Sequence, residues 1–430
     1  MSPGPRAASL SRMEPASGYR RFLAAFGFFT LVAGDVWRYL LSWWGWGAIV
    51  AVFLTLAIVE LVRSRVDVRR VPLLLLASLA LMALSVTWSA YPGATALAVV
   101  ATLATTVFAV FLATCFTWPE RIEALALSMR VVIVASLLFE LFVAVVIRQP
   151  VLPLWVDYSA LDEIPRAFYW SRDVLFEGGR IQGIVGNANL LAMAALLSII
   201  AEVARAVAGC GNRARGIAAI VLAVLVLALT RSSTILIATV VVGVVVLAAW
   251  FARRGSGRRR VATVLGMLVA AGAAVAGAIV FRGPLLALLG RSEDLTNRIG
   301  IWTTVLDLAN ERPVAGWGWI SYWAPWVEPF DDLVVINGVT YLQAHNAWID
   351  IFLQLGVIGL VVLGLFALTT AIRSWSFALD GPRDSALVPV ALLTAVFVQS
   401  LAESRLLIES GWAIFVLVAI TTAYNRWERR

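Results

Sequence analysis

The chain has 430 residues, of which 61% are hydrophobic and only 14% are charged, and its formal net charge is +8. A soluble domain carries about 25% charged residues, so this sequence lacks the polar residues that cover a water-exposed surface. All 34 basic residues are arginine, and His345 is the single histidine. This excludes a soluble nucleic-acid-binding protein, a multi-histidine metal site and a lysine Schiff-base enzyme.

Apolar runs of about twenty residues recur along the whole chain and predict an all-α polytopic membrane protein. Residues 1–19 are mostly polar and are expected to form a disordered cytoplasmic tail, and residues 20–430 to form a single transmembrane domain. We expect about twelve transmembrane helices, at about 20–36, 40–62, 71–88, 94–116, 127–148, 184–206, 216–230, 234–252, 261–282, 347–372, 385–402 and 408–425.

The arginines predict the orientation, because basic residues collect in cytoplasmic loops. They cluster before the first span and after the second, sixth, eighth and twelfth, whereas the short loops on the opposite side contain only Arg38, Arg231 and Arg405. Both termini are therefore expected in the cytoplasm, and the loops 149–183 and 283–346 on the outer face. Loops of this length are usually functional.

The two outer loops contain helical and aromatic patterns. The first has apolar and charged residues between Leu161 and Arg172 that favour a short interfacial amphipathic helix. The second has a helical stretch, Arg298–Ala309, followed by residues 316–319 with the sequence Gly-Trp-Gly-Trp.

Most tryptophans lie near the outer face, and an aromatic belt at the membrane boundary explains those at the ends of spans. A belt does not explain the tryptophans inside the large loop. Stacking on sugar rings is the other interpretation, and it makes Trp302, Trp317 and Trp319 candidate glycan-binding residues.

Three arginines lie at the outer boundary: Arg180 before the sixth span, Arg231 in the turn between the seventh and eighth, and Arg298 in the large loop. An arginine at the membrane boundary is costly unless it is paired or hydrated, so it indicates function by default. For any one of them, a snorkelling side chain or a lipid-headgroup contact is an equal alternative. Guanidinium groups bind phosphate oxygens in bidentate geometry at any relevant pH without a metal, so the three together indicate an anionic substrate.

His345 lies where the large loop meets the tenth span, and Asn346 follows it. A structural hydrogen bond is the ordinary role of a lone histidine at such a position. However, histidine is the side chain that normally titrates near neutral pH, and this one faces the same compartment as the three arginines. A neutral imidazole there can take a proton from an attacking hydroxyl while arginines stabilise a departing phosphate.

The acidic residues are weaker candidates. Glu140 favours a structural role within the fifth span, and Glu403, Arg405 and Glu409 read as a solvated or ion-paired turn. Asp350 is five residues past His345, too far round a helix to share its face.

At these residues the sequence resembles the O-antigen ligase and polymerase superfamily of bacterial membrane glycosyltransferases. The resemblance covers residues 178 to about 365 and is strongest at His345-Asn346, followed after nine residues by Gly356 and then Gly359. The other matching segments are 180–189, Arg231 with Ser232 in reversed order, and Arg298 with Trp302 leading to 316–318.

The resemblance implies a fold of the GT-C type and a glycosyltransferase without metal or other cofactor. Its donor would be a glycan linked to polyprenyl (undecaprenyl) diphosphate, and its acceptor a glycan or glycolipid hydroxyl on the outer face of the bacterial cytoplasmic membrane. His345 would be the base, and Arg180, Arg231 and Arg298 would hold the diphosphate, with inversion at the anomeric carbon. Asn346 belongs to the same motif and is a fourth candidate glycan-binding residue.

Two other functions fit the sequence. A polymerase of the same superfamily would lengthen the lipid-linked polysaccharide instead of attaching it to a final acceptor, as a ligase does in lipopolysaccharide. A transporter or flippase for an anionic lipid is the alternative outside the family. Against it stand the absence of interrupted helices in an inverted repeat and the concentration of unusual residues on one face.

Overall fold

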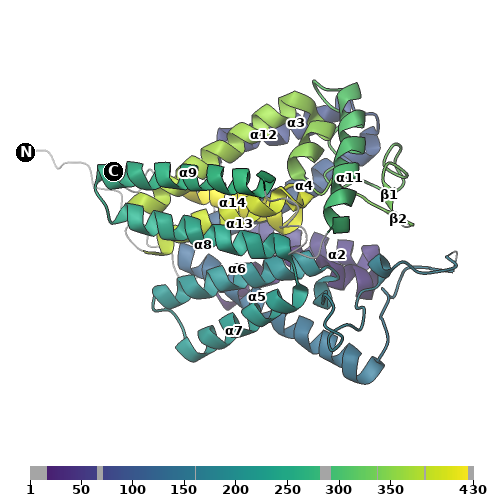
Figure 1. The fold of residues 1–430 in the computed structure, drawn as a ribbon, viewed down its shortest axis with the longest axis horizontal. Helices are drawn as coiled ribbons and strands as arrows, with labels where there is room; N and C mark the ends of the chain where they lie inside the picture. Colours follow the sequence, from purple (N-terminus) through teal and green to yellow (C-terminus); the bar gives the residue numbers. More distant parts are fainter. Residues whose placement is uncertain are drawn as a thin grey trace, which may run out of the picture.

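The computed structural model describes residues 17–64, 71–159, 161–280, 292–336, 338–381 and 384–424, and their regular secondary structure is almost entirely helical (Figure 1). The α-helices are α1 (Gly18–Val32), α2 (Gly34–Arg63), α3 (Leu73–Leu84), α4 (Pro92–Cys115), α5 (Trp118–Phe142), α6 (Ala188–Val207), α7 (Arg213–Thr230), α8 (Ser233–Arg253), α9 (Gly257–Val280), α11 (Ser292–Glu311), α12 (Ala347–Asp380), α13 (Val388–Ser400) and α14 (Glu409–Tyr424). Two strands, β1 (Val335–Ile336) and β2 (Val339–Thr340), pair in an antiparallel hairpin. Single turns of 3₁₀ or π helix are η2 (Ser85–Thr87), η3 (Val143–Ile147), η4 (Arg166–Phe168), η5 (Gly183–Val185), η6 (Asp384–Leu387) and η7 (Ser404–Leu407).

Each predicted apolar segment contains a helix, which confirms an all-α polytopic membrane protein. Within the described residues, seven helices are long and apolar enough to cross a membrane: α2, α4, α5 together with η3, α6, α7, α8 and α12. The apolar helices α3, α13 and α14 are shorter. Of the predicted tail, residues 1–16 lie outside the described residues, and α1 already begins at Gly18.

Side chains at the helix ends explain where several helices begin. Glu120 accepts hydrogen bonds from the backbone and hydroxyl of Thr117, and this capping box starts α5 at Trp118, well before the predicted residue 127. Asn187 and Asn346 cap α6 and α12 by accepting hydrogen bonds from backbone N–H groups of the first turn. These two caps fix the chain next to the candidate site.

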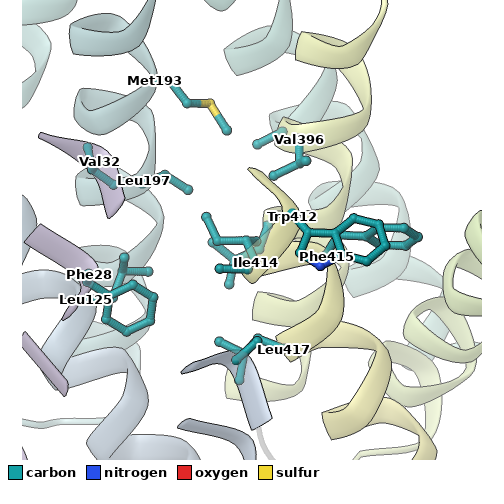
Figure 2. Close-up of a cluster of buried hydrophobic side chains, with 14 of the residues drawn as sticks. Phe28, Val32, Leu125, Met193, Leu197, Val396, Trp412, Ile414, Phe415 and Leu417 are labelled. Atoms are coloured by element: carbon teal, nitrogen blue, oxygen red, sulfur yellow. The ribbon is translucent and has the colours of Figure 1, made fainter. Parts of the chain in front are cut away.

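Helix α14 lies at the centre of the packing. Its residues are buried without interruption from Trp412 to Ile420. Figure 2 shows Ile414 and Leu417 of this helix between side chains of α1, α5, α6 and α13, such as Phe28, Leu125 and Val396. Lipid tails are as apolar as these side chains, so close packing rather than exclusion from water holds such helices together.

Seven of the other helices form two groups (Figure 1). Helices α5, α6, α7 and α8 lie in the lower half of the view, and α3, α4 and α12 lie in the upper half. Helix α11 packs on α12 and lies with the β1–β2 hairpin at the right-hand end.

The predicted amphipathic helix between Leu161 and Arg172 is wrong. The segment forms only the three-residue turn η4 after Pro165. Its continuation is extended, because the backbone N–H groups of Trp170 and Ser171 both donate to the carbonyl of Val151.

Two helices are interrupted. In α2, Ser42 has φ 66° and ψ 177°, and in α12, Gly356 has φ 62° and ψ −160°. Each break leaves backbone groups without helical partners, and loop segments bond to them. The N–H of Trp317 donates to the carbonyl of Leu353 (3.0 Å), and that of Gly318 to the carbonyl of Gln354 (2.9 Å).

Candidate active site

The single histidine lies at ion-pair distance from a buried carboxylate. His345 precedes the cap of α12 and has a left-handed backbone conformation, with φ 50°. Its Nδ1 lies 2.9 Å from Oε2 of Glu403, which comes from the link between α13 and η7. The ring of Tyr341 contacts the imidazole edge-on, with centroids 5.5 Å apart. His345 is therefore oriented from two sides.

Glu403 is the centre of the polar network. It is 4% exposed, and Asn189 Nδ2 (2.8 Å), Gln343 Nε2 (3.1 Å) and Arg298 Nη2 (3.6 Å) surround its carboxylate. Burial raises the pKa of Glu403, but the pairing with His345 and the charge of Arg298 outweigh it and lower the pKa to about 2. Glu403 is therefore an anion at every physiological pH.

Asn189 connects this carboxylate to the second arginine. Its Oδ1 accepts hydrogen bonds from Arg180 Nη2 (2.8 Å) and from the hydroxyl of Ser232 (2.8 Å). Arg180 also donates through Nε to the carbonyl of Thr230 (3.1 Å) at the end of α7. Arg180 and Arg298, far apart in sequence, thus meet around the Glu403–Asn189 pair.

Arg231 lies at the same place in the fold. It occupies the α7–α8 turn between Thr230 and Ser232, has φ 47°, and is exposed. A Cβ atom on Gly178 would lie 3.2 Å from its Nη2, so the guanidinium lies against the glycine segment that leads to Arg180. The site therefore brings three arginine side chains together in the fold, and such a group of cations favours an anionic ligand.

The three predicted glycan-binding tryptophans lie in three different environments. Trp302 is half-buried and donates to the carbonyl of Ala344 (3.0 Å), directly beside His345. Trp317 is covered by the guanidinium of Arg312, 4.1 Å from the ring centroid. Trp319 has no exposed surface, and its indole donates to Thr102 of α4 (3.1 Å). A ring without exposed surface has no face for a sugar, so Trp319 packs the loop onto the bundle.

Asn346, the residue after His345, uses its side chain for structural hydrogen bonds. Its Oδ1 caps α12 by accepting from the N–H groups of Trp348 and Ile349, and its Nδ2 lies 3.4 Å from the carbonyl of Leu401.

The sequence interpretation set Asp350 aside as too far round the helix from His345, but its hydrogen bonds connect it to this site. It is completely buried and accepts hydrogen bonds from the Trp323 indole (2.8 Å), the backbone N–H of Ala344 (3.0 Å) and the hydroxyl of Ser404. Asp350 thus joins the segment before His345 to the segment after Glu403.

Of the two alternatives predicted for Glu403, Arg405 and Glu409, a solvated or an ion-paired turn, the structure shows the ion-paired one. Glu403 pairs with His345 and Arg298 and is buried, and Arg405 forms an ion pair of 2.7 Å with Glu409. Glu140 has the predicted structural role, since its carboxylate accepts from the N–H groups of Gln182 (2.9 Å) and Gly183 (2.6 Å).

Gln343 holds Glu403 in place through both ends of its amide. The Nε2 atom donates to the Glu403 carboxylate, while Oε1 accepts from the backbone N–H of Ser404 (3.0 Å).

Within the described ranges, no three His, Cys, Asp or Glu side chains lie close enough together to hold a metal ion.

The described residues define a polytopic helical membrane protein in which a half-buried histidine pairs with a buried carboxylate beside three arginines. The family model described as O-antigen ligase matches residues 218–364, a range that contains Arg231, Arg298 and His345 but neither Arg180 nor Glu403. An exopolysaccharide production protein, ExoQ, of Rhizobium meliloti (strain 1021) is 24% identical over 143 residues, which are 32% of this chain. The chain spans about a third of the length of this curated relative, since the match covers 33% of it. Both matches support a relationship of this part of the chain to the O-antigen ligase and polymerase superfamily.

Proposed function

We propose that this protein transfers a glycan from a polyprenyl-diphosphate carrier to an acceptor hydroxyl at the outer face of the bacterial cytoplasmic membrane. The observation that carries the proposal is the 2.9 Å pair of His345 and Glu403 within a cluster of arginines. The proposal includes twelve membrane crossings in a GT-C-type arrangement, with both termini in the cytoplasm. The charged end of the bundle then faces outward.

His345 is the proposed base. Because Nδ1 faces the Glu403 carboxylate, the ring proton resides on Nδ1 and Nε2 is left to accept a proton. The acceptor O–H gives its proton to Nε2, and its oxygen attacks the anomeric carbon as the bond to the diphosphate oxygen breaks. Glu403 stabilises the imidazolium that forms, in the way a buried carboxylate supports the histidine of a hydrolase triad.

The arginines are the proposed binding site of the leaving group. The departing diphosphate takes the bonding electron pair and gains charge, which Arg180, Arg231 and Arg298 stabilise. Attack opposite the leaving group inverts the anomeric configuration. Three fixed cations supply the charge that a divalent metal supplies elsewhere, so transfer is expected to continue in the presence of a chelator.

The test uses the purified full-length chain in lipid nanodiscs with a radiolabelled polyprenyl-diphosphate oligosaccharide. His345→Ala should abolish transfer and leave the protein folded, because no other described side chain replaces the base. Asp331→Ala, an exposed acidic residue in the same loop, is the matched control and should transfer normally. Near-normal turnover by His345→Ala would remove the base assignment.

A polymerase is the second candidate, and the name of the relative, an exopolysaccharide production protein, favours it. A gel of the lipid-linked products separates the two reactions. A polymerase lengthens the carrier-bound glycan, whereas a ligase leaves its length unchanged and labels a different acceptor.

The transporter alternative draws support from the helix breaks at Ser42 and Gly356, because interrupted helices form substrate sites in transporters. Here protein segments occupy the freed backbone groups: residues 313–318 bond around Gly356, and the N–H of Leu154 donates to the carbonyl of Tyr39. The breaks therefore anchor loops, and we favour the transferase.

A further inference from the structure

A cavity of about 500 Å³ lies among α1, α2, α4 and the start of α14, and we call it the α1–α2 cavity. Its size is within the range of about 300–1,000 Å³ typical of small-molecule sites. Arg180, Arg231 and Arg298 do not line this cavity. Its lining residues fall into two groups of different chemistry, which together indicate the class of ligand.

One part of the cavity is apolar. It is lined by Leu31 of α1, Phe53 and Leu54 of α2, and Ala104 and Phe108 of α4. Residues 101–108 lie in the middle of α4, which is long enough to cross a membrane. This part of the cavity therefore extends to the depth of the hydrocarbon, where an alkyl or isoprenyl chain is the expected occupant.

The other part of the cavity is lined by four charged residues, in which acidic and basic side chains alternate along a chain of ion pairs. Arg38 bonds to Asp35 (2.7 Å) and to Glu409 (3.0 Å), and Arg405 bonds to Glu409 (2.7 Å). In this set, two cations and two anions balance. A balanced set favours an uncharged polar group that both donates and accepts hydrogen bonds, such as a sugar or glycerol hydroxyl.

Aromatic side chains and an unused donor border this polar part. Trp43 and Trp155 line the cavity and are 66% and 64% exposed, with Trp155 held by a 2.7 Å hydrogen bond to the carbonyl of Leu40. The indole Nε1 of Trp46 is buried and has no partner among the described residues. Exposed rings and a free indole N–H are suited to a hydroxylated headgroup.

Some residues that line the α1–α2 cavity are close in sequence to the proposed active-site residues. Leu342 lines it three residues before His345, and Arg405 lines it two residues after Glu403. Tyr322 also lines it, and the charge of Glu403 contributes to raising its pKa, after burial as the main cause. The polar part of the cavity is therefore the part from which a ligand headgroup would reach the histidine.

We propose that the α1–α2 cavity binds the acceptor of the transfer, a membrane lipid with an uncharged, hydroxyl-bearing headgroup. This rests on the proposed function, because only a glycosyl transferase needs such an acceptor. The hydrocarbon chain lies between α1, α2 and α4, and the headgroup hydroxyl reaches His345 past Leu342. Charge balance at Asp35, Arg38, Arg405 and Glu409 selects against phosphorylated headgroups.

The test measures binding without turnover. The probe is a monoglucosyl diacylglycerol with a diazirine in one acyl chain, and the protein is full-length His345→Ala in nanodiscs. Ala104→Trp fills the apolar part, and displacing two or more methylenes from it should reduce labelling by about tenfold or more. Val100→Trp on the same helix is the control, because Val100 is 62% exposed and does not line the cavity.

A second variant tests the headgroup. Glu409→Gln leaves the arginines in excess, so labelling should shift from the glucosyl probe toward a photoactivatable phosphatidic acid. In the active protein, Ala104→Trp should raise KM for the lipid acceptor and leave KM for the carrier-linked donor unchanged.

Three results would overturn the proposal: equal labelling of Ala104→Trp and Val100→Trp, no shift in Glu409→Gln, or a raised KM for the donor alone, which would assign the cavity to the carrier tail. Failure of the proposed function looks different. In that case the probe labels the cavity as expected, but no variant, including the wild type, forms a glycosylated product.

Discussion

Replacing Glu403 by glutamine tests the proposed mechanism most directly, because it changes the charge and almost nothing else. Glutamine has the same length and can still accept a hydrogen bond from Nδ1 of His345. It removes the negative charge that stabilises the imidazolium, and it leaves Arg298 without its carboxylate partner. Asn189 and Gln343, which contact the Glu403 carboxylate, would then contact a glutamine amide of similar shape.

The distances give the expected size of the effect. The charge centres of a carboxylate and an imidazolium in contact are about 4 Å apart, and at an effective dielectric constant of about 20 they attract by about 4 kcal/mol. Since about 1.4 kcal/mol corresponds to a factor of ten in rate, kcat should fall by about a thousandfold. The KM for the lipid-linked donor should change little, because the arginines remain.

The assay is single-turnover transfer in nanodiscs, with Glu311→Gln at the exposed end of α11 as the matched control. A Glu403→Gln protein that is folded and transfers at a rate near that of the wild type would refute the assigned role of the carboxylate. A loss in KM with unchanged kcat would instead make Glu403 part of the donor site.

The same variant has a predicted pH signature. The pKa of Glu403 in the folded protein, about 2, lies below its ordinary value of 4.5. A lowered pKa contributes stability that is complete above the ordinary pKa and is lost as the pH falls toward the folded value. The stability difference between wild type and Glu403→Gln should therefore be constant near neutrality and shrink below about pH 4.5.

Two further predictions concern the arginines and the break in α12. Arg231→Lys and Arg298→Lys should each lower kcat/KM by about 10–100-fold, because a point charge replaces a bidentate fork; full activity in both lysine variants would refute diphosphate binding by these residues. Gly356→Ala should lower the unfolding free energy by about 1–3 kcal/mol, because alanine is strained at φ 62° and its Cβ meets the carbonyl of Val314. The effect is measured by thermal unfolding against Gly364→Ala, where a Cβ meets nothing; equal melting temperatures would contradict the role given to the break.

The features that follow from local composition could be predicted from the sequence. Membrane spans need only a long apolar run, so helices occur at each predicted segment even where their ends differ. The arginines and His345 were found because charged groups and a lone titratable group are rare against such a background. Asn189 and Gln343 carry no such signal, since an amide near a span end is common.

Glu403 could not be found in this way, because its meaning depends on a contact across the chain. It lies 58 residues from His345, in a link whose neighbours Arg405 and Glu409 are ion-paired. It is surrounded by side chains from distant parts of the chain, namely Asn189, Arg298 and residues 343–345. The burial of Trp319 is likewise a long-range result, because it depends on Thr102 of α4.

The packing of α11 on α12 explains in physical terms the spacing between His345 and Gly356. Asn346 starts α12 beside His345, and Gly356 interrupts it about ten residues later, where Gly316 packs against Gln354 and anchors the end of the large loop. From this anchor, α11 extends back along α12, and Trp302 donates to Ala344 beside His345. Residues 302–311 and 347–356 are segments of equal length, about 14 Å at 1.5 Å per residue. A change in the spacing between His345 and Gly356 would therefore move α11 along α12 and carry Arg298 away from Glu403.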